Sequence, residues 1–150
     1  MSDSSGKWFG KLFKRGSEPV DAAAWNRKGN SLDNSGRSEE AIFCFDKALE
    51  LDPRRGGTWY NKGNSLKELG QPEKALLCLD QALELDSSSI EIWCNKGNFL
   101  DDLHRPEEAI RSFEQALKLD LRRAYDSVLW AEFVLGTLPI ILIILPVAFM

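Results

Sequence analysis

The sequence predicts an all-α protein in which three similar helix pairs are stacked as an α-solenoid. When the 150-residue chain is compared with itself at an offset of 34 residues, the same tryptophans and glycines coincide: Trp25, Trp59, Trp93, Gly29, Gly63 and Gly97. Within each period, apolar residues recur at helical spacings of three and four in two successive stretches. A fixed period of this size is typical of stacked repeats, because a single unit cannot bury its own apolar face. We therefore divide the middle of the chain into units 22–55, 56–89 and 90–123.

The helix boundaries are clearest in the third unit. Ser88 and Glu91 have the spacing of a capping box, which predicts a first helix from about Ile90 to Leu103. His104 then falls in a short turn. Pro106 stands where a second helix begins, a position at which its missing N–H costs nothing.

The recurring small residues predict close packing between the two helices of each unit. The three glycines lie inside the first helices, where glycine costs roughly 1 kcal/mol relative to alanine. Their recurrence indicates that helix backbones approach too closely for a side chain. Alanines recur at the facing places of the second helices: Ala41, Ala75 and Ala109.

These features resemble the tetratricopeptide repeat (TPR) family. The resemblance rests on the 34-residue period, on Trp followed four residues later by Gly, on paired alanines seven apart, and on the closing Leu51, Asp52 and Pro53. It covers residues 22–123 and implies antiparallel helix pairs stacked into a right-handed superhelix. The inner groove, lined by the first helices, would hold a peptide or helix of another protein.

The repeats depart from the family pattern at a few places. Ser87 and Leu121 stand where the family usually has the closing proline, and His104 replaces the turn glycine seen as Gly36 and Gly70. These departures concern how the third unit ends.

Polar residues of the first helices are the candidate groove residues. Asparagine is unusually common among them, although it is a poor residue for a helix interior. Its amide carries both a donor and an acceptor, which suits the backbone of an extended peptide. The alternative is that these asparagines only solvate an exposed face. The candidates are Asn26, Arg27, Asn30, Tyr60, Asn61, Asn64, Lys67, Asn95, Asn98 and Asp101.

One speciality of the family is not expected here. TPR domains that capture the C-terminal carboxylate of heat-shock chaperones place basic residues in the first and third repeats. Asn30 and Asn61 match that pattern, but Asn26, Glu91 and Asn95 stand where the basic residues would be. A carboxylate would lose its water without gaining a cation, so we predict no carboxylate clamp.

The net charge of the chain limits the class of partner that it can bind. The formal net charge is −4, which argues against nucleic acid because phosphate binding needs a basic surface. Among the residues of the first helices that are expected to face the groove, Arg27 and Lys67 stand against five acidic residues: Asp33, Glu68, Glu91, Asp101 and Asp102. We therefore expect a neutral or basic protein segment as partner.

The segment 124–150 is expected to form a capping turn that runs into a membrane span. From Phe133 to Met150 there is no charged residue, and 18 helical residues reach about 27 Å, close to the hydrocarbon thickness of a bilayer. Arg122 and Arg123 precede this stretch, which predicts that the repeats face the cytoplasm. The alternatives are a cytoplasmic protein and the N-terminal piece of a longer one.

The N-terminal segment 1–21 is basic and rich in Ser and Gly. Trp8, Phe9, Leu12 and Phe13 share one helical face and lysines lie on the other, a pattern that favours a helix lying on anionic lipid. The alternative is a disordered basic tail.

No motif indicates catalysis or a cofactor. His104 is the only histidine, and no nucleophile stands in motif context. Cys44, Cys78 and Cys94 lack zinc-ligand spacing and cannot all pair in disulfides. We therefore expect a non-enzymatic, membrane-tethered adaptor without cofactor or metal. The alternative is an assembly or regulatory subunit of a multi-subunit membrane complex.

Overall fold

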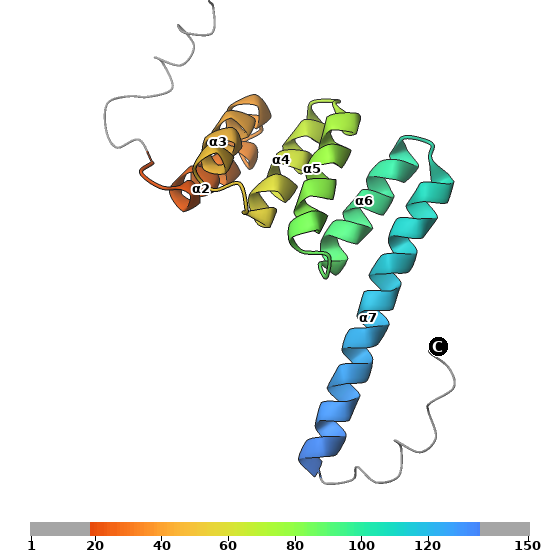
Figure 1. Cartoon of the computed structure of the whole chain (residues 1–150). Coiled ribbons are helices and arrows are strands. Elements are labelled where there is room, and N and C mark those ends of the chain that lie inside the picture. Colours follow the sequence, from red (N-terminus) through yellow and green to blue (C-terminus); the bar gives the residue numbers. More distant parts are fainter. Residues whose placement is uncertain (1–18, 136–150) are drawn as a thin grey trace, which may run out of the picture. The chain divides into compact units, whose positions relative to one another are not determined.

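The computed structural model describes residues 19–135, and all regular secondary structure in that range is α-helical (Figure 1). The helices are α2 (Ala22–Asp33), α3 (Ser38–Leu51), α4 (Gly56–Glu68), α5 (Pro72–Leu85), α6 (Ile90–Asp102) and α7 (Pro106–Leu135). Each predicted repeat thus supplies one helix pair. The expected all-α class is confirmed.

The chain forms two compact units that divide between Ser87 and Ser88. The first contains α2 to α5, that is, the first two repeats. Within it α2 packs on α3, α3 on α4, and α4 on α5. The second unit contains α6 packed on α7.

Side-chain caps fix the starts of two first helices. Asp21 accepts a hydrogen bond from the backbone N–H of Ala24 at 2.6 Å, which satisfies one of the free donors at the start of α2. In α6 the cap is Ser89, whose Oγ accepts from the N–H of Ile92 at 3.4 Å. The expected capping box at Ser88 was therefore wrong by one residue, because α6 begins directly after Ser89, the last of three adjacent serines.

The turns inside the repeats have left-handed backbone. Gly36 and Gly70 have φ angles of 72° and 68°, and His104 takes the same place in the third repeat with φ 57°. Glycine adopts this conformation at little cost, while other residues do so rarely. His104 therefore lies in an exposed turn, as the sequence predicted.

Helix α7 is longer than expected. It continues without a break for 30 residues, from Pro106 to Leu135. The capping turn that we expected from residue 124 is therefore not formed. The reason is local, because no Pro or Gly follows Pro106 within the helix and Leu121 replaces the proline that ends the first repeat.

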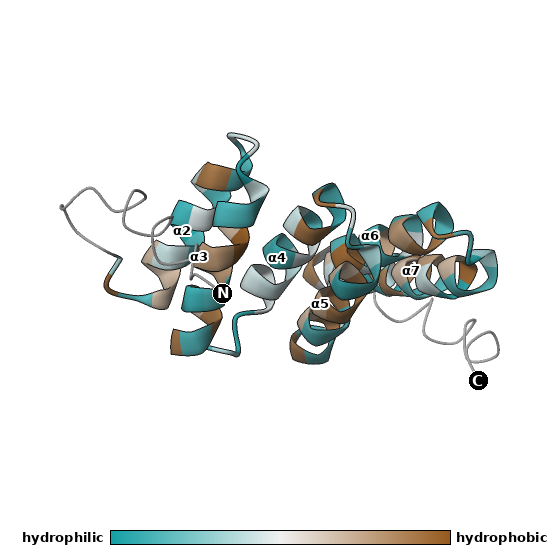
Figure 2. Ribbon diagram, turned by 90° about the horizontal axis from the view of Figure 1, so that it is seen from above, coloured by the Kyte–Doolittle hydropathy of each residue, from teal (hydrophilic) through white to brown (hydrophobic). Residues whose placement is uncertain are grey.

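The second helices carry most of the core. In Figure 2 the ribbon of α5 is largely brown, and α4 is mostly teal and white. Ala41, Ala75 and Ala109 are 0%, 0% and 3% exposed, which confirms that they face their partner helices.

The recurring glycines mark the closest approaches, as predicted. A Cβ at Gly29 would lie 2.7 Å from Cδ1 of Phe45, and one at Gly97 would lie 2.6 Å from Cε1 of Phe113. At Gly63 it would lie 3.2 Å from the backbone oxygen of Ala75. Each glycine therefore removes a clash that any larger residue would create.

The N-terminal segment 1–18 and residues 136–150 lie outside the described residues, and with them the expected interfacial helix and most of the expected membrane span. No helix within residues 19–135 combines the length and apolar character needed to cross a membrane.

Substituting the repeat glycines should give unequal losses of stability. Phe45 is fully buried and cannot move away, so the clash in Gly29→Ala should lower the free energy of unfolding by about 1–3 kcal/mol. The higher helix propensity of alanine should offset about 1 kcal/mol of this loss. The ring of Phe113 is 39% exposed and can turn toward solvent, so Gly97→Ala should be nearly neutral. Urea unfolding followed by circular dichroism measures both. Equal losses would contradict the packing argument.

Candidate peptide-binding face

The first helices carry the candidate groove residues, and we call these residues the asparagine face. In the first unit, Asn26, Asn30, Tyr60, Asn61, Asn64 and Lys67 are half-buried and Arg27 is exposed. In the second unit, Asn95 is half-buried, and Asn98 and Asp101 are exposed. Each set is described within its own unit.

The structure brings together three asparagines from the first two repeats. The Asn61 Nδ2 donates to Oδ1 of Asn30 at 2.8 Å and, more weakly, to Oδ1 of Asn26 at 3.4 Å. Asn61 lies on α4, and its two acceptors lie one helical turn apart on α2. These amides therefore bind the first two repeats to each other, a role that neither sequence interpretation included.

The same amides keep hydrogen-bonding capacity for a ligand. Within residues 19–135, the Asn61 Oδ1 and the amide N–H groups of Asn26 and Asn30 have no protein partner. Neither Asn64 nor Asn98 has a side-chain hydrogen bond in this range. The face thus offers both donors and acceptors, which are the groups that an extended backbone requires.

Two buried serines continue the contact between the repeats. Ser65 on α4 is fully buried and donates to Asp33 at 2.7 Å, and Ser38 on α3 donates to Glu68 at 2.7 Å. Hydrogen bonds to carboxylates are roughly twice as strong as those between neutral groups. They fix the two carboxylates that end the first helices of the first unit.

A lysine that the sequence interpretation missed lies over each repeat tryptophan. The ammonium groups of Lys28, Lys62 and Lys96 are 5.3, 5.4 and 5.5 Å from the ring centroids of Trp25, Trp59 and Trp93. This distance allows a cation–π interaction. The signal was present in the sequence, because the three lysines also recur at an offset of 34 residues.

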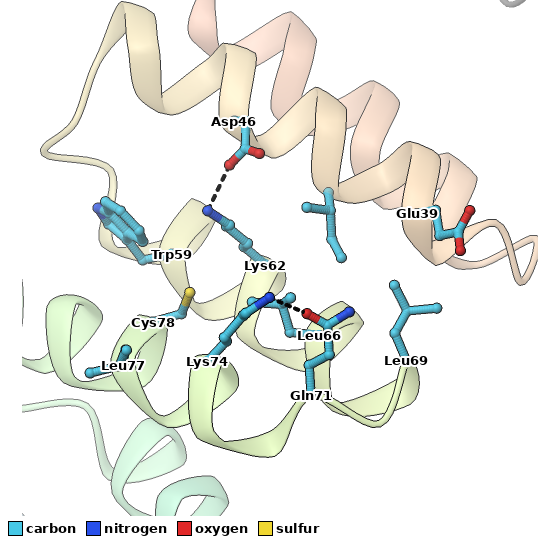
Figure 3. A pocket seen from close by; sticks show the side chains of 11 residues that line it. Glu39, Asp46, Trp59, Lys62, Leu66, Leu69, Gln71, Lys74, Leu77 and Cys78 are labelled. Atoms are coloured by element: carbon cyan, nitrogen blue, oxygen red, sulfur yellow. Dashed lines mark hydrogen bonds and ion pairs between the residues drawn. The ribbon is translucent and has the colours of Figure 1, made fainter. Parts of the chain in front are cut away.

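A pocket of about 530 Å³ lies in the first unit, between α3, α4 and α5 (Figure 3). Figure 3 shows Lys62 from α4 reaching Asp46 on α3, with Leu77 and Cys78 on α5 below them. The ion pair between Lys62 and Asp46 is 2.7 Å long. It ties the second helix of one repeat to the first helix of the next.

A second pocket, of about 710 Å³, lies in the second unit. It is lined by Ser88, Ser89, Ile90, Glu91, Leu119, Arg122, Arg123 and Asp126. The two arginines are balanced by two carboxylates, so the lining has no net charge.

Two of the three cysteines pack in the core, and Cys94 is half-buried. Cys44 and Cys78 occupy equivalent places on α3 and α5, and burial raises the pKa of both thiols. A raised thiol pKa lowers the fraction of reactive thiolate. Among the described residues, no three His, Cys, Asp or Glu side chains are grouped so as to hold a metal ion.

The tetratricopeptide repeat model matches residues 22–55, 58–89 and 90–120. The chain belongs to the tetratricopeptide repeat family. Repeats of this family are a protein-interaction fold.

Curated relatives match one part of the chain. The peroxisomal targeting signal receptor of Candida albicans is 60% identical over 35 residues, and that of Saccharomyces cerevisiae is 57% identical over 35 residues. In both cases the match spans 23% of this chain and only 6% of the receptor.

Solved structures show the same fold over more of the chain. The crystal structure of MamA aligns with a TM-score of 0.69 and 19% identity, over 71% of this chain and 62% of MamA. The second TPR of Spaghetti (RPAP3), bound to the HSP90 peptide SRMEEVD, aligns with a TM-score of 0.63 and 25% identity. That alignment covers 67% of this chain and 93% of the RPAP3 domain.

Removing the inter-repeat amide should cost stability, while removing a neighbouring amide should not. Asn61→Ala breaks the bonds to Asn30 and Asn26 and should lower the free energy of unfolding by about 1 kcal/mol. Asn64→Ala should raise the free energy of unfolding by about a few tenths of a kcal/mol, because alanine is the better helix former. The measurement is urea unfolding followed by circular dichroism. Similar effects of the two substitutions would show that the amide bonds contribute nothing to stability.

Proposed function

We propose that this chain is a non-enzymatic adaptor whose asparagine face binds an extended segment of another protein through its backbone. The observation that carries the proposal is the amide cluster of Asn26, Asn30 and Asn61. Its mutual hydrogen bonds orient the amides while leaving donors and acceptors open to a ligand. Groups that are already oriented lose less entropy when a ligand binds.

The charge of the candidate groove residues determines which kind of peptide segment is preferred. Among the candidate groove residues of the first helices, two cations, Arg27 and Lys67, stand against five carboxylates: Asp33, Glu68, Glu91, Asp101 and Asp102. A neutral or basic segment therefore suits the face better than an acidic one.

The RPAP3 domains bind an acidic HSP90 peptide, and this chain is proposed to differ from them. Asn26, Glu91 and Asn95 stand at the places where the carboxylate-binding pattern requires cations. Binding of a free carboxylate without a cation would leave its charge uncompensated.

Loss of unpaired amides should weaken peptide binding without unfolding the chain. We expect wild type to bind immobilised neutral and basic peptides of about a dozen residues and to ignore SRMEEVD. Asn64→Ala together with Asn98→Ala should weaken that binding about tenfold, since each lost hydrogen bond contributes roughly 0.5–1.5 kcal/mol. The readout is biolayer interferometry.

The matched control is Gln115→Ala, which removes an exposed carboxamide from α7. Unchanged affinity in the asparagine double variant would refute backbone capture by these amides. Tight binding of SRMEEVD would refute the absence of a carboxylate clamp.

We further propose that residues 133–150 tether the adaptor to a membrane with the repeats in the cytoplasm. The support comes from the sequence: the stretch lacks charge over 18 residues, and Arg122 and Arg123 precede it. Pro139 and Pro146 interrupt it, but proline is tolerated in membrane helices.

Charged residues in this stretch should release the chain from membranes. An arginine near the centre of a span costs roughly 2.5–3.5 kcal/mol for insertion. Ile141→Arg together with Ile144→Arg should therefore move the chain from the carbonate-resistant membrane pellet to the supernatant. Gln115→Arg, which adds the same charge on α7, should leave it in the pellet. Wild type in the supernatant would contradict the tether.

A further inference from the structure

Helix α7 presents a continuous apolar stripe beside the face that packs against α6, and Phe113, at the edge of the stripe, also contacts Gly97 of α6. Ala109, Ser112 and Ala116 form its buried side. The stripe, which we call the α7 stripe, consists of Ile110, Phe113, Leu117, Leu121, Tyr125 and Val128, all between 39% and 58% exposed. Spacings of three and four residues place these side chains on one face of the helix, over about 27 Å.

Equivalent positions in the first repeat are covered. The residues 68 positions before Phe113 and Leu117 are Phe45 and Leu49, which are 0% and 7% exposed. They lie on α3, which packs against both α2 and α4. The α7 stripe therefore corresponds to positions that neighbouring helices bury in the first unit.

The first helices do not offer a matching surface. The exposed side chains of α2 are Arg27 and Ser31, and those of α4 are limited to Glu68. Stacking such a helix of a second copy on the α7 stripe would leave polar groups without partners against apolar side chains. The α7 stripe of a second copy, in contrast, is an apolar surface of the same length and character.

The spacing of the stripe is the same when read from either end. Its steps are three, four, four, four and three residues, and its centre is Leu119. In an antiparallel pair of α7 helices, Ile110 of one copy would face Val128 of the other, and Phe113 would face Tyr125. Leu117 would face Leu121. This is the self-complementary pattern that a two-fold symmetric interface requires.

Charges beside the stripe favour the same orientation. By helical spacing, Glu114, Lys118 and Arg122 lie on one flank, and all three are exposed. An antiparallel pair places Glu114 of one copy near Arg122 of the other. In a parallel pair this flank would face the opposite flank of the partner helix, so the pairing of Glu114 with Arg122 would be lost.

From these observations we propose that the α7 stripe is a homodimer interface in which two copies of the chain pair through antiparallel α7 helices. A helix pair of this length with six large apolar side chains on each helix falls near the lower end of stable interfaces, about 1,200 Å² of total buried area. The proposal is independent of what the asparagine face binds.

The test measures the oligomeric state of the full chain in detergent micelles by sedimentation equilibrium. We expect wild type to dimerise in the micromolar range. Leu117→Glu together with Leu121→Glu should weaken the dimer at least a hundredfold. The matched control is Leu51→Glu together with Leu77→Glu, two leucines that are 58% and 64% exposed outside the stripe, and it should remain dimeric. Circular dichroism checks that each variant is folded.

A charge exchange tests the orientation without altering the stripe. Glu114→Arg should weaken the dimer, and adding Arg122→Glu on the same chain should restore it. The proposal is overturned if wild type is monomeric at all concentrations, or if the stripe variant still dimerises. It is also overturned if the control variant at Leu51 and Leu77 loses the dimer to the same extent. The same holds if Arg122→Glu does not restore the dimer that Glu114→Arg weakens. A monomer whose stripe instead binds phosphatidylcholine vesicles would assign the surface to lipid and also overturn it.

Discussion

The contact between a glycine on the first helix and a large side chain on the second determines the geometry of each helix pair. Phe45 fits against Gly29, and Phe113 fits against Gly97. This contact sets the distance between the two helices, and the distance decides which residues of each helix remain at the surface. The polar surface of the first helices and the exposed stripe of α7 both follow from it.

Polar contacts then join one helix pair to the next in the first unit. The amide of Asn61, the hydroxyl of Ser65 and the ammonium group of Lys62 all reach from α4 to the first repeat. Apolar packing alone would allow the repeats to slide or rotate, because dispersion and hydrophobic contacts have little directional preference. Hydrogen bonds restrict that freedom, so the contact between the repeats also orients the groups offered to a ligand.

Much of the fold could be predicted from the sequence, because repetition gives three independent readings of each position. The period predicted the helix pairs, the glycines predicted the close approaches, and the position of His104 predicted a short turn. The cap at Ser89 was missed because the capping-box pattern fits Ser88 with Glu91, whereas the residue three after Ser89 is Ile92. The continuity of α7 was missed because the family pattern was given more weight than the absence of Pro and Gly after Pro106.

The candidate site was less accessible to prediction. The bond between Asn61 and Asn30 depends on how far one helix pair is rotated against the next, and no residue spacing within a repeat encodes that rotation. The lysines over the tryptophans could have been found, since they share the repeat offset.

The buried thiols of Cys44 and Cys78 have an experimental consequence. Each sits in the core of a different helix pair, so an alkylating reagent reaches it only after that pair has opened. Natural local unfolding in the first and second repeats can therefore be followed separately, without an introduced label, by the rate at which each thiol is modified. The third repeat carries Ser112 at the same place, and its own thiol, Cys94 on α6, is only half-buried, so modification of Cys94 would not by itself report opening.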